Sequence, residues 1–150
     1  MKKVCNLLIL GIVLMLIATG CKGNEDVEIV EPHNIYGYWK KTTGNEYLRF
    51  MTEQEDMRDG DYLFGYEWNE DDDVLESDIL KQYHGNGWFK YKITTDTVGR
   101  KTTTTLFEIM KMDYGWADIP KQYKVSVLSS SKMVYEDDYS KTFQFSKVTR

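Results

Sequence analysis

Large apolar and polar residues alternate through most of the chain from residue 35 onward. Tyr62, Phe64, Tyr66 and Trp68 fall on one face of an extended segment, while Asp61, Gly65 and Glu67 fall on the other. A period of two is typical of strands that bury one face. The same alternation predicts further strands near 48–50, 88–93, 102–112, 123–127, 133–135 and 142–146.

Turn-forming residues separate these segments. Glycine and asparagine tolerate the backbone conformations that tight turns need. Segments that contain glycine or asparagine occur at 43–45, 59–61, 84–87 and 98–99. The spacing predicts about eight short strands joined in sequence, with antiparallel neighbours.

One segment has a different period. Leu75, Ile79 and Tyr83 recur every fourth residue, which predicts a short helix within 75–83. A single sheet of about eight strands leaves exposed edges unless it closes. We therefore predict an all-β fold, a small antiparallel up-and-down β-barrel of about eight strands with one short helix.

The first 21 residues have the three parts of a secretory signal. Lys2 and Lys3 begin it, an apolar run covers 7–17, and the small residues before Cys21 end it. A helix of this length rises about 16 Å, roughly half of the hydrocarbon thickness that a spanning helix must cross. The run is therefore interpreted as a signal core.

The residues Ala18-Thr19-Gly20-Cys21 resemble the lipobox of bacterial lipoproteins, with Ala18 where leucine is usual. The resemblance implies cleavage after Gly20, a diacylglyceryl thioether on Cys21 and acylation of the new amine. Several lipid chains together make a durable membrane anchor, whereas one chain binds reversibly. The other cysteine, Cys5, lies in the segment that cleavage removes, so no disulfide framework is expected.

These signals predict three parts: a signal peptide (1–20), a lipidated cysteine with an acidic tether (21–34) and one β domain (35–150). The tether has four acids and no aromatic residue, as solvated linkers do. Its acids resemble the surface-export signal of some gut anaerobes, and Lys22 is not the aspartate that retains lipoproteins at the inner membrane. We expect a protein anchored in the outer membrane and displayed at the surface.

Gly37-Tyr38-Trp39, on the first predicted strand, resembles the G-x-W signature of lipocalins. Residues 35–148 as a whole resemble the lipocalin-like domains of Gram-negative envelope lipoproteins. The resemblance implies that Trp39 closes the barrel floor, beside Gly37 and against a basic side chain near the end, here Lys147. The chain departs from true lipocalins in having no helix after the last strand, which argues against a full-sized ligand cavity.

The net charge and the candidate catalytic and metal-binding residues limit the classes of function that the sequence allows. The net charge is −5, or −7 once residues 1–20 are removed, which argues against nucleic acid as a partner. His84 precedes a Gly-Asn-Gly turn and is assigned no catalytic role, and His33 and His84 are not at zinc-ligand spacing. The acidic run 70–73 is interpreted as a solvated loop, because Leu75 stands where a calcium loop needs glycine. We expect no enzyme, no cofactor and no metal site.

Two functions remain. The aromatic residues of two strands, expected to face one another, are candidates for lining a ligand site, although filling of the barrel by its own rings is favoured. These candidates are Tyr62, Phe64, Tyr66, Trp68, Phe89 and Tyr91. We expect a non-enzymatic binding module that contacts a protein or another macromolecule through loops and exposed rings such as Trp88 or Trp116. The alternative is a lipocalin-type carrier of a small hydrophobic ligand.

Overall fold

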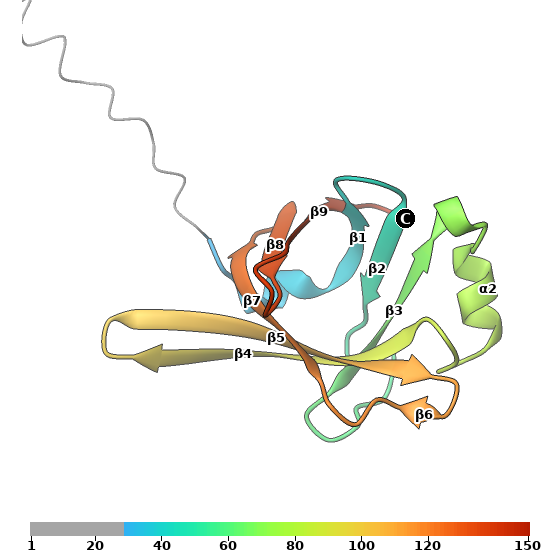
Figure 1. The fold of residues 1–150 in the computed structure, drawn as a ribbon, viewed down its shortest axis with the longest axis horizontal. Coiled ribbons are helices and arrows are strands. Elements are labelled where there is room, and N and C mark those ends of the chain that lie inside the picture. The colour runs from blue at the N-terminus through green and yellow to red at the C-terminus, as the bar shows by residue number, and fades with distance from the viewer. Residues whose placement is uncertain (1–28) are drawn as a thin grey trace, which may run out of the picture.

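The computed structural model describes residues 29–150, which form a closed antiparallel β-barrel (Figure 1). Eight strands follow one another around the barrel in sequence order, and pairing of the first with the last closes the ring. They are β1 (Gly37–Lys41), β2 (Glu46–Phe50), β3 (Leu63–Asn69), β4 (Trp88–Val98), β5 (Lys101–Met112), β7 (Lys121–Leu128), β8 (Lys132–Glu136) and β9 (Thr142–Val148). The two-residue β6 (Gly115–Trp116) pairs with the end of β5. The predicted all-β barrel is confirmed.

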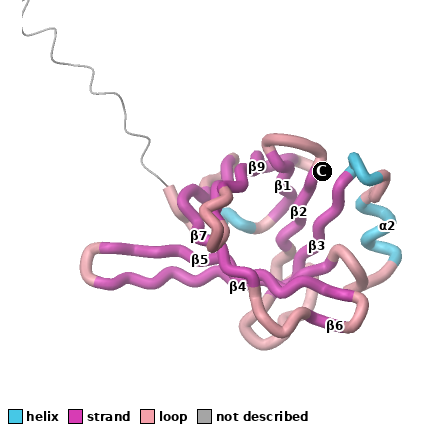
Figure 2. Tube along the Cα trace, in the orientation of Figure 1, coloured by secondary structure: helices cyan, strands magenta, loops and turns pink. Residues whose placement is uncertain are grey.

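Within residues 29–150, helical structure is confined to short segments at the edge of the barrel (Figure 2). These are η1 (Pro32–Ile35), η2 (Glu70–Asp72) and α2 (Glu76–Lys81), and the last confirms the short helix predicted within 75–83. The Asp78 carboxylate accepts a hydrogen bond from the Leu75 backbone N–H at 3.2 Å, which satisfies a free donor at the start of α2. Within 29–150, no helix is both long and apolar enough to cross a membrane.

A continuous group of apolar side chains, the inner cluster, fills the barrel. Trp39, Phe50 and Phe89 are completely buried. The Phe50 ring packs edge-to-face against Phe89 and Tyr91, with centroid distances of 5.4 and 4.9 Å. Burial of each such side chain contributes about 1.5–3 kcal/mol. The cluster consists of Ile35, Trp39, Leu48, Phe50, Leu63, Phe89, Tyr91, Leu106, Val125, Leu128, Met133, Tyr135 and Phe145.

The barrel floor brings together the three residues that the lipocalin resemblance singles out. Trp39 pairs with Lys147 across β1 and β9, and the Lys147 ammonium lies 5.0 Å from the Trp39 ring centroid. That ammonium also donates to the Asn34 carbonyl at 2.8 Å, while the Trp39 indole donates to the Ile35 carbonyl at 2.7 Å. Gly37 has a φ of +112°, and a Cβ there would lie 3.1 Å from Lys147 Cε. η1 thus closes this end of the barrel.

Residues 29–34, expected in the tether, belong to the folded domain. Val30 forms a parallel bridge with Leu128, and the Glu31 N–H donates to the Leu128 carbonyl at 2.9 Å. β5 pairs with β7 only as far as Val125, so the end of β7 has a free edge. The chain that leads into η1 uses this edge. Polar composition alone did not reveal the pairing, because it is made by backbone groups.

β4 and β5 extend beyond the barrel as a two-stranded arm (Figure 1). They pair through to Val98 and Lys101, whereas β3 pairs with β4 only as far as Tyr91 and β7 with β5 only as far as Thr104. Threonine hydroxyl groups contact one another across the arm, as at Thr95 and Thr104 (3.1 Å). The arm is therefore held mainly by its own ladder.

Gly65 marks the tightest contact in the barrel wall. A Cβ at this position would lie 2.5 Å from both the Arg49 carbonyl oxygen and the Phe89 ring. We expect Gly65→Ala to lower the free energy of unfolding by about 1–3 kcal/mol, the usual effect of overpacking. Chemical denaturation measures it. The control is Gly99→Ala, where a Cβ meets nothing and only the positive φ is unfavourable. Equal loss in both variants would contradict the packing explanation.

Candidate functional site

The structure divides the predicted ligand-lining residues between two sides of the barrel wall. In the β3–β4 ladder, Gly65 pairs with Phe89, and Tyr66 pairs with Trp88. Directly paired residues lie on the same face. Phe89 and Tyr91 therefore point into the barrel, while Phe64 and Tyr66 point outward.

The expectation that these two sets face one another is wrong. Residues 63–66 are all buried, so both faces of β3 are covered and alternation cannot tell which of them is inside. The interior has room only for glycine at position 65, because the Phe89 ring occupies the space. The large rings of β3 consequently lie outside, in a second group that we call the outer cluster. It consists of Tyr47, Phe64, Tyr66, Trp68 and Trp88.

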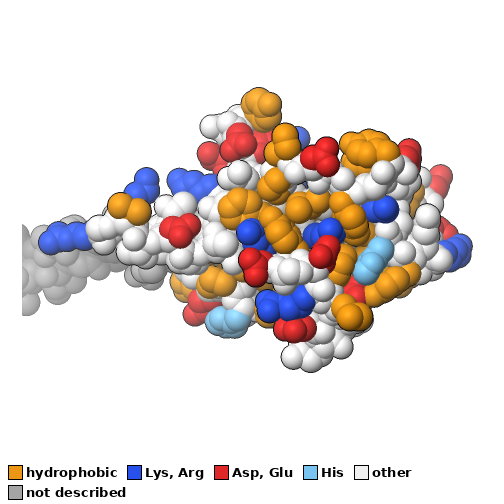
Figure 3. Space-filling model, turned by 90° about the horizontal axis from the view of Figure 1, so that it is seen from below, with side chains coloured by type: hydrophobic (Ala, Val, Ile, Leu, Met, Phe, Trp, Pro, Cys, Tyr) orange, Lys and Arg blue, Asp and Glu red, His pale blue; other side chains and the backbone are white. Residues whose placement is uncertain are grey.

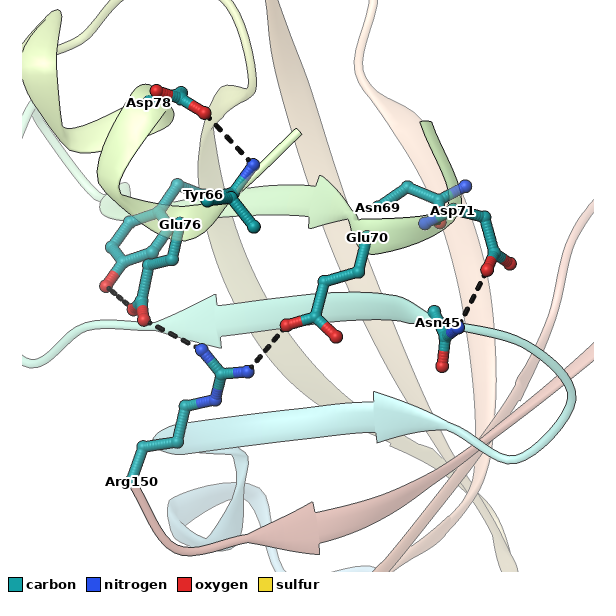
Figure 4. A network of polar contacts seen from close by, with 9 residues as sticks. Asn45, Tyr66, Asn69, Glu70, Asp71, Glu76, Asp78 and Arg150 are labelled. Carbon is teal, nitrogen blue, oxygen red and sulfur yellow. Dashed lines mark hydrogen bonds and ion pairs between the residues drawn. The ribbon is translucent and has the colours of Figure 1, made fainter. Parts of the chain in front are cut away.

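Arg150 covers part of the outer cluster and reaches Glu70 and Glu76, as Figure 4 shows for the two glutamates. Its guanidinium lies 4.7 Å from the Tyr47 ring centroid and 5.0 Å from that of Trp68. It also pairs with Glu70 and Glu76, at 3.0 Å in each case. One side chain near the end of β9 thus ties η2 and α2 to the outside of the barrel. Its five donors allow two carboxylates to be bound while the planar group stacks on the rings.

A third group of rings lies on the outer side of β4, β5 and β6. Each ring has a lysine ammonium over it: Lys92 lies 4.9 Å from Tyr62 and 5.4 Å from Phe107. Figure 3 shows hydrophobic side chains interspersed with basic ones on this face. Lys90 and Lys111 lie 4.5 and 5.4 Å from the Trp116 ring. We call this group of six residues the aromatic–lysine surface; Trp88, by contrast, is fully buried.

The open end of the barrel, opposite η1, carries carboxylates that the sequence analysis missed. Glu46 on β2, Glu67 on β3 and Glu108 on β5 lie in register with the inward-facing positions of their strands. We call these three the carboxylate layer. The alternation does place Glu67 on the same face as Leu63 and Gly65. It did not identify an inward-facing carboxylate, because a charged residue is expected to face water.

Glu108 is the least solvated member of this layer. It is 6% exposed, and its Oε1 atom has no hydrogen-bond partner among the described residues. Burial and the neighbouring Glu67 raise the pKa of Glu108 to about 8, while Lys121 and the Tyr123 hydroxyl act in the opposite direction. Burial, with Glu46, also raises the pKa of Glu67. Glu67 and Glu108 thus hold protons more strongly than ordinary carboxylates do.

A pocket of about 260 Å³, the rim pocket, opens beside this layer. Tyr123 and Phe143 form an aromatic wall together with Tyr135, at centroid distances of 4.7 Å (Tyr123–Tyr135) and 5.4 Å (Tyr135–Phe143). Lys121 pairs with Glu108 across the β5–β7 ladder, so the pocket wall adjoins the buried carboxylate. The lining residues are Lys121, Gln122, Tyr123, Asp137, Asp138, Tyr139 and Phe143.

The His84 side chain is held in place by contacts with neighbouring residues of the protein. Its Nε2 lies 2.8 Å from an oxygen of the buried Asp56, and its ring stacks on Phe64 at 4.1 Å and on Tyr83 at 3.9 Å. Asp56 also accepts hydrogen bonds from the Tyr83 hydroxyl and the Met57 N–H. These contacts attach the 51–62 loop to the turn before β4. The ring is sandwiched rather than presented to a substrate.

The acidic run 70–73 forms η2 and a turn, and its three aspartates are exposed. Across 29–150, no set of three or more His, Cys, Asp or Glu side chains is arranged to hold a metal ion. Cys21 and the signal segment lie outside the described residues.

No protein-family model matches the chain, and no curated protein or solved structure is significantly similar to it. Its function is therefore inferred from its own residues and their arrangement.

The raised pKa of Glu108 predicts an unusual pH dependence of stability. Between its ordinary value of 4.5 and about 8, the folded state binds more protons than the unfolded state. Stability therefore falls as the pH rises through this range. We expect Glu108→Gln to remove much of this slope and to be more stable than the wild type at about pH 8.5 by about 1–3 kcal/mol. Urea denaturation at several pH values measures it, and parallel slopes in the two proteins would contradict the assignment.

Proposed function

We propose that this protein is a non-enzymatic binding module, held by a lipid anchor at Cys21 in the outer membrane and displayed at the cell surface. Its partner is a protein or another macromolecule, which binds at the aromatic–lysine surface. The anchor and location rest on the lipobox resemblance and on the acidic residues that follow Cys21. The observation that carries the binding role is the contrast between a filled barrel and an outer face with accessible rings.

Filling of the interior supports the module over the carrier. A barrel of eight strands is just wide enough to be filled by side chains or to hold one small ligand. Here the rings of Phe50, Phe89 and Tyr91 pack together in its middle and Trp39 fills its floor, all with almost no exposed surface. A hydrophobic ligand of ordinary size would have to displace these rings and lose their packing. The carrier remains the second candidate.

The aromatic–lysine surface has the chemistry of a contact surface. Tyr62, Phe107 and Trp116 are half-buried, and the neighbouring Tyr114 and Ile119 are about four-fifths exposed. Large rings contribute much of the binding energy at protein interfaces. The lysines over these rings would pair with acidic groups of a partner. The surface of that partner would therefore combine apolar and acidic residues.

The contacts of His84 support a non-enzymatic role. It is the one histidine of residues 35–150, and its ring is occupied by Asp56 and by stacking on two aromatic rings. Its Nε2 lies 2.8 Å from Asp56 and is not available to a proton of a substrate or nucleophile, as a general base requires. The Asp56 contact instead fastens a loop.

The anchor is tested by Cys21→Ala in cells. We expect the variant to move from the membrane fraction to the soluble fraction and to lose labelling by fatty-acid analogues, because the thioether cannot form. Cys5→Ala is the matched control and should leave both properties unchanged. Membrane retention and labelling of the Cys21 variant at the wild-type level would contradict lipidation.

The contact surface is tested by photo-cross-linking in the native cells. A photoreactive side chain at position 116 should give discrete adducts, because it lies within the proposed interface. The control carries the same group at position 98, the exposed tip of the arm. With an adduct in hand, Trp116→Ala should weaken binding of that partner by about 10-fold or more. Equal cross-linking at both positions, or none at 116, would contradict the proposal.

A further inference from the structure

We infer that the open end of the barrel is a second binding site, for a small organic cation that has an apolar group. The ammonium lies beside Glu108 and the apolar group lies in the rim pocket over Tyr123 and Phe143. This site is separate from the aromatic–lysine surface, and it does not depend on the proposed partner there.

The carboxylate layer lacks a positive charge. Three carboxylates of the layer face two lysine ammonium groups, and Lys41 is paired with Glu46. Glu67 and Glu108 are left with Lys121, which is an exposed residue at the rim. Buried carboxylates need a counter-charge or a proton. Since Glu108 Oε1 is buried without a partner, this atom is where a cation would be accepted.

An aromatic wall lies beside the Glu108 carboxylate. Two ammonium groups of the protein itself already lie over Phe143: Lys41 at 5.5 Å and Lys141 at 5.0 Å from its centroid. The ring therefore stands in a position that attracts cations. Asp137 and Asp138 line the same pocket and add negative charge at its entrance. Tyr123 lines the pocket and its hydroxyl contacts Glu108, so the pocket leads from acids and rings toward that carboxylate.

The size of the rim pocket limits the size of the ligand. At about 260 Å³ the rim pocket is smaller than the about 300–1,000 Å³ typical of sites for drug-sized ligands. It suits a ligand with a single ring or a short alkyl chain. Recognition by both a ring wall and a buried carboxylate selects for molecules in which the cation and the apolar group are close together.

Binding of the cation is coupled to release of a proton from Glu108. Without a ligand, a proton neutralises Glu108 at neutral pH, as its raised pKa indicates. When the ammonium binds, the carboxylic acid releases that proton to solvent and the ion pair forms. The groups that set this equilibrium face Glu108 or its neighbour Glu67 from the surrounding strands: Lys41, Glu46, Glu67, Lys121, Tyr123 and Tyr135.

The test is calorimetric titration of the full mature protein with 2-phenylethylammonium, compared with 2-phenylethanol, which has nearly the same shape without the charge. We expect the ammonium to bind at least about 10-fold more tightly than the alcohol, with its affinity rising between about pH 6 and 8. Titration at neutral pH in buffers with different ionisation enthalpies should show proton release. Equal binding of both probes, or no binding of the ammonium at millimolar concentration, would overturn the inference.

Glu108→Gln keeps the shape of the side chain and removes its charge. We expect it to lower ammonium affinity about 10-fold or more and to abolish proton release. The matched control is Glu53→Gln, an exposed glutamate with only a 3.6 Å pairing to Arg58. Should the Glu108 variant fail to fold, Phe143→Leu supplies the second test, since loss of the ring should also weaken binding. Wild-type affinity in a folded Glu108→Gln protein, or in Phe143→Leu, would contradict the site.

Discussion

The narrow cross-section of the barrel is the constraint on which the rest of the structure depends. The rings of Phe50, Phe89 and Tyr91 fill its middle, so the adjacent strand can contribute only Gly65 at that level. The large rings of β3 are therefore placed outside. An outward-facing aromatic group needs its own cover, and α2 and Arg150 provide it. One packing requirement inside the wall thus explains elements that lie outside it.

The two ends of the barrel interior differ in how fully their buried polar groups are bonded. At the floor, Trp39 is buried under η1 with Lys147 over its ring, a closed and fully bonded arrangement. At the other end, Glu108 is buried without a complete set of partners. The closed end stabilises the fold, whereas the open end keeps a polar group that packing alone does not explain. Function is therefore more readily accommodated at the rim and on the outer face than in the middle of the barrel.

The strands, their order and the short helix were predictable because alternation and turn residues are local signals. The inner or outer placement of Phe64 and Tyr66 was not, since both faces of β3 are buried and only the fit against Phe89 decides between them. The buried Glu108 was missed for a related reason: its burial depends on neighbours from β3 and β7 that are distant in sequence. The pairing of residues 29–31 with β7 was hidden because backbone groups make it.

Native mass spectrometry of the protein purified from its own cells tests most directly whether the barrel is filled by its own side chains. We expect a mass equal to that of the polypeptide with its covalent modifications alone, with no uncharged apolar molecule retained in stoichiometric amount. A stoichiometric uncharged lipid or other apolar compound that stays bound after removal of detergent would contradict it. Such a compound would show that the inner cluster opens to hold a ligand.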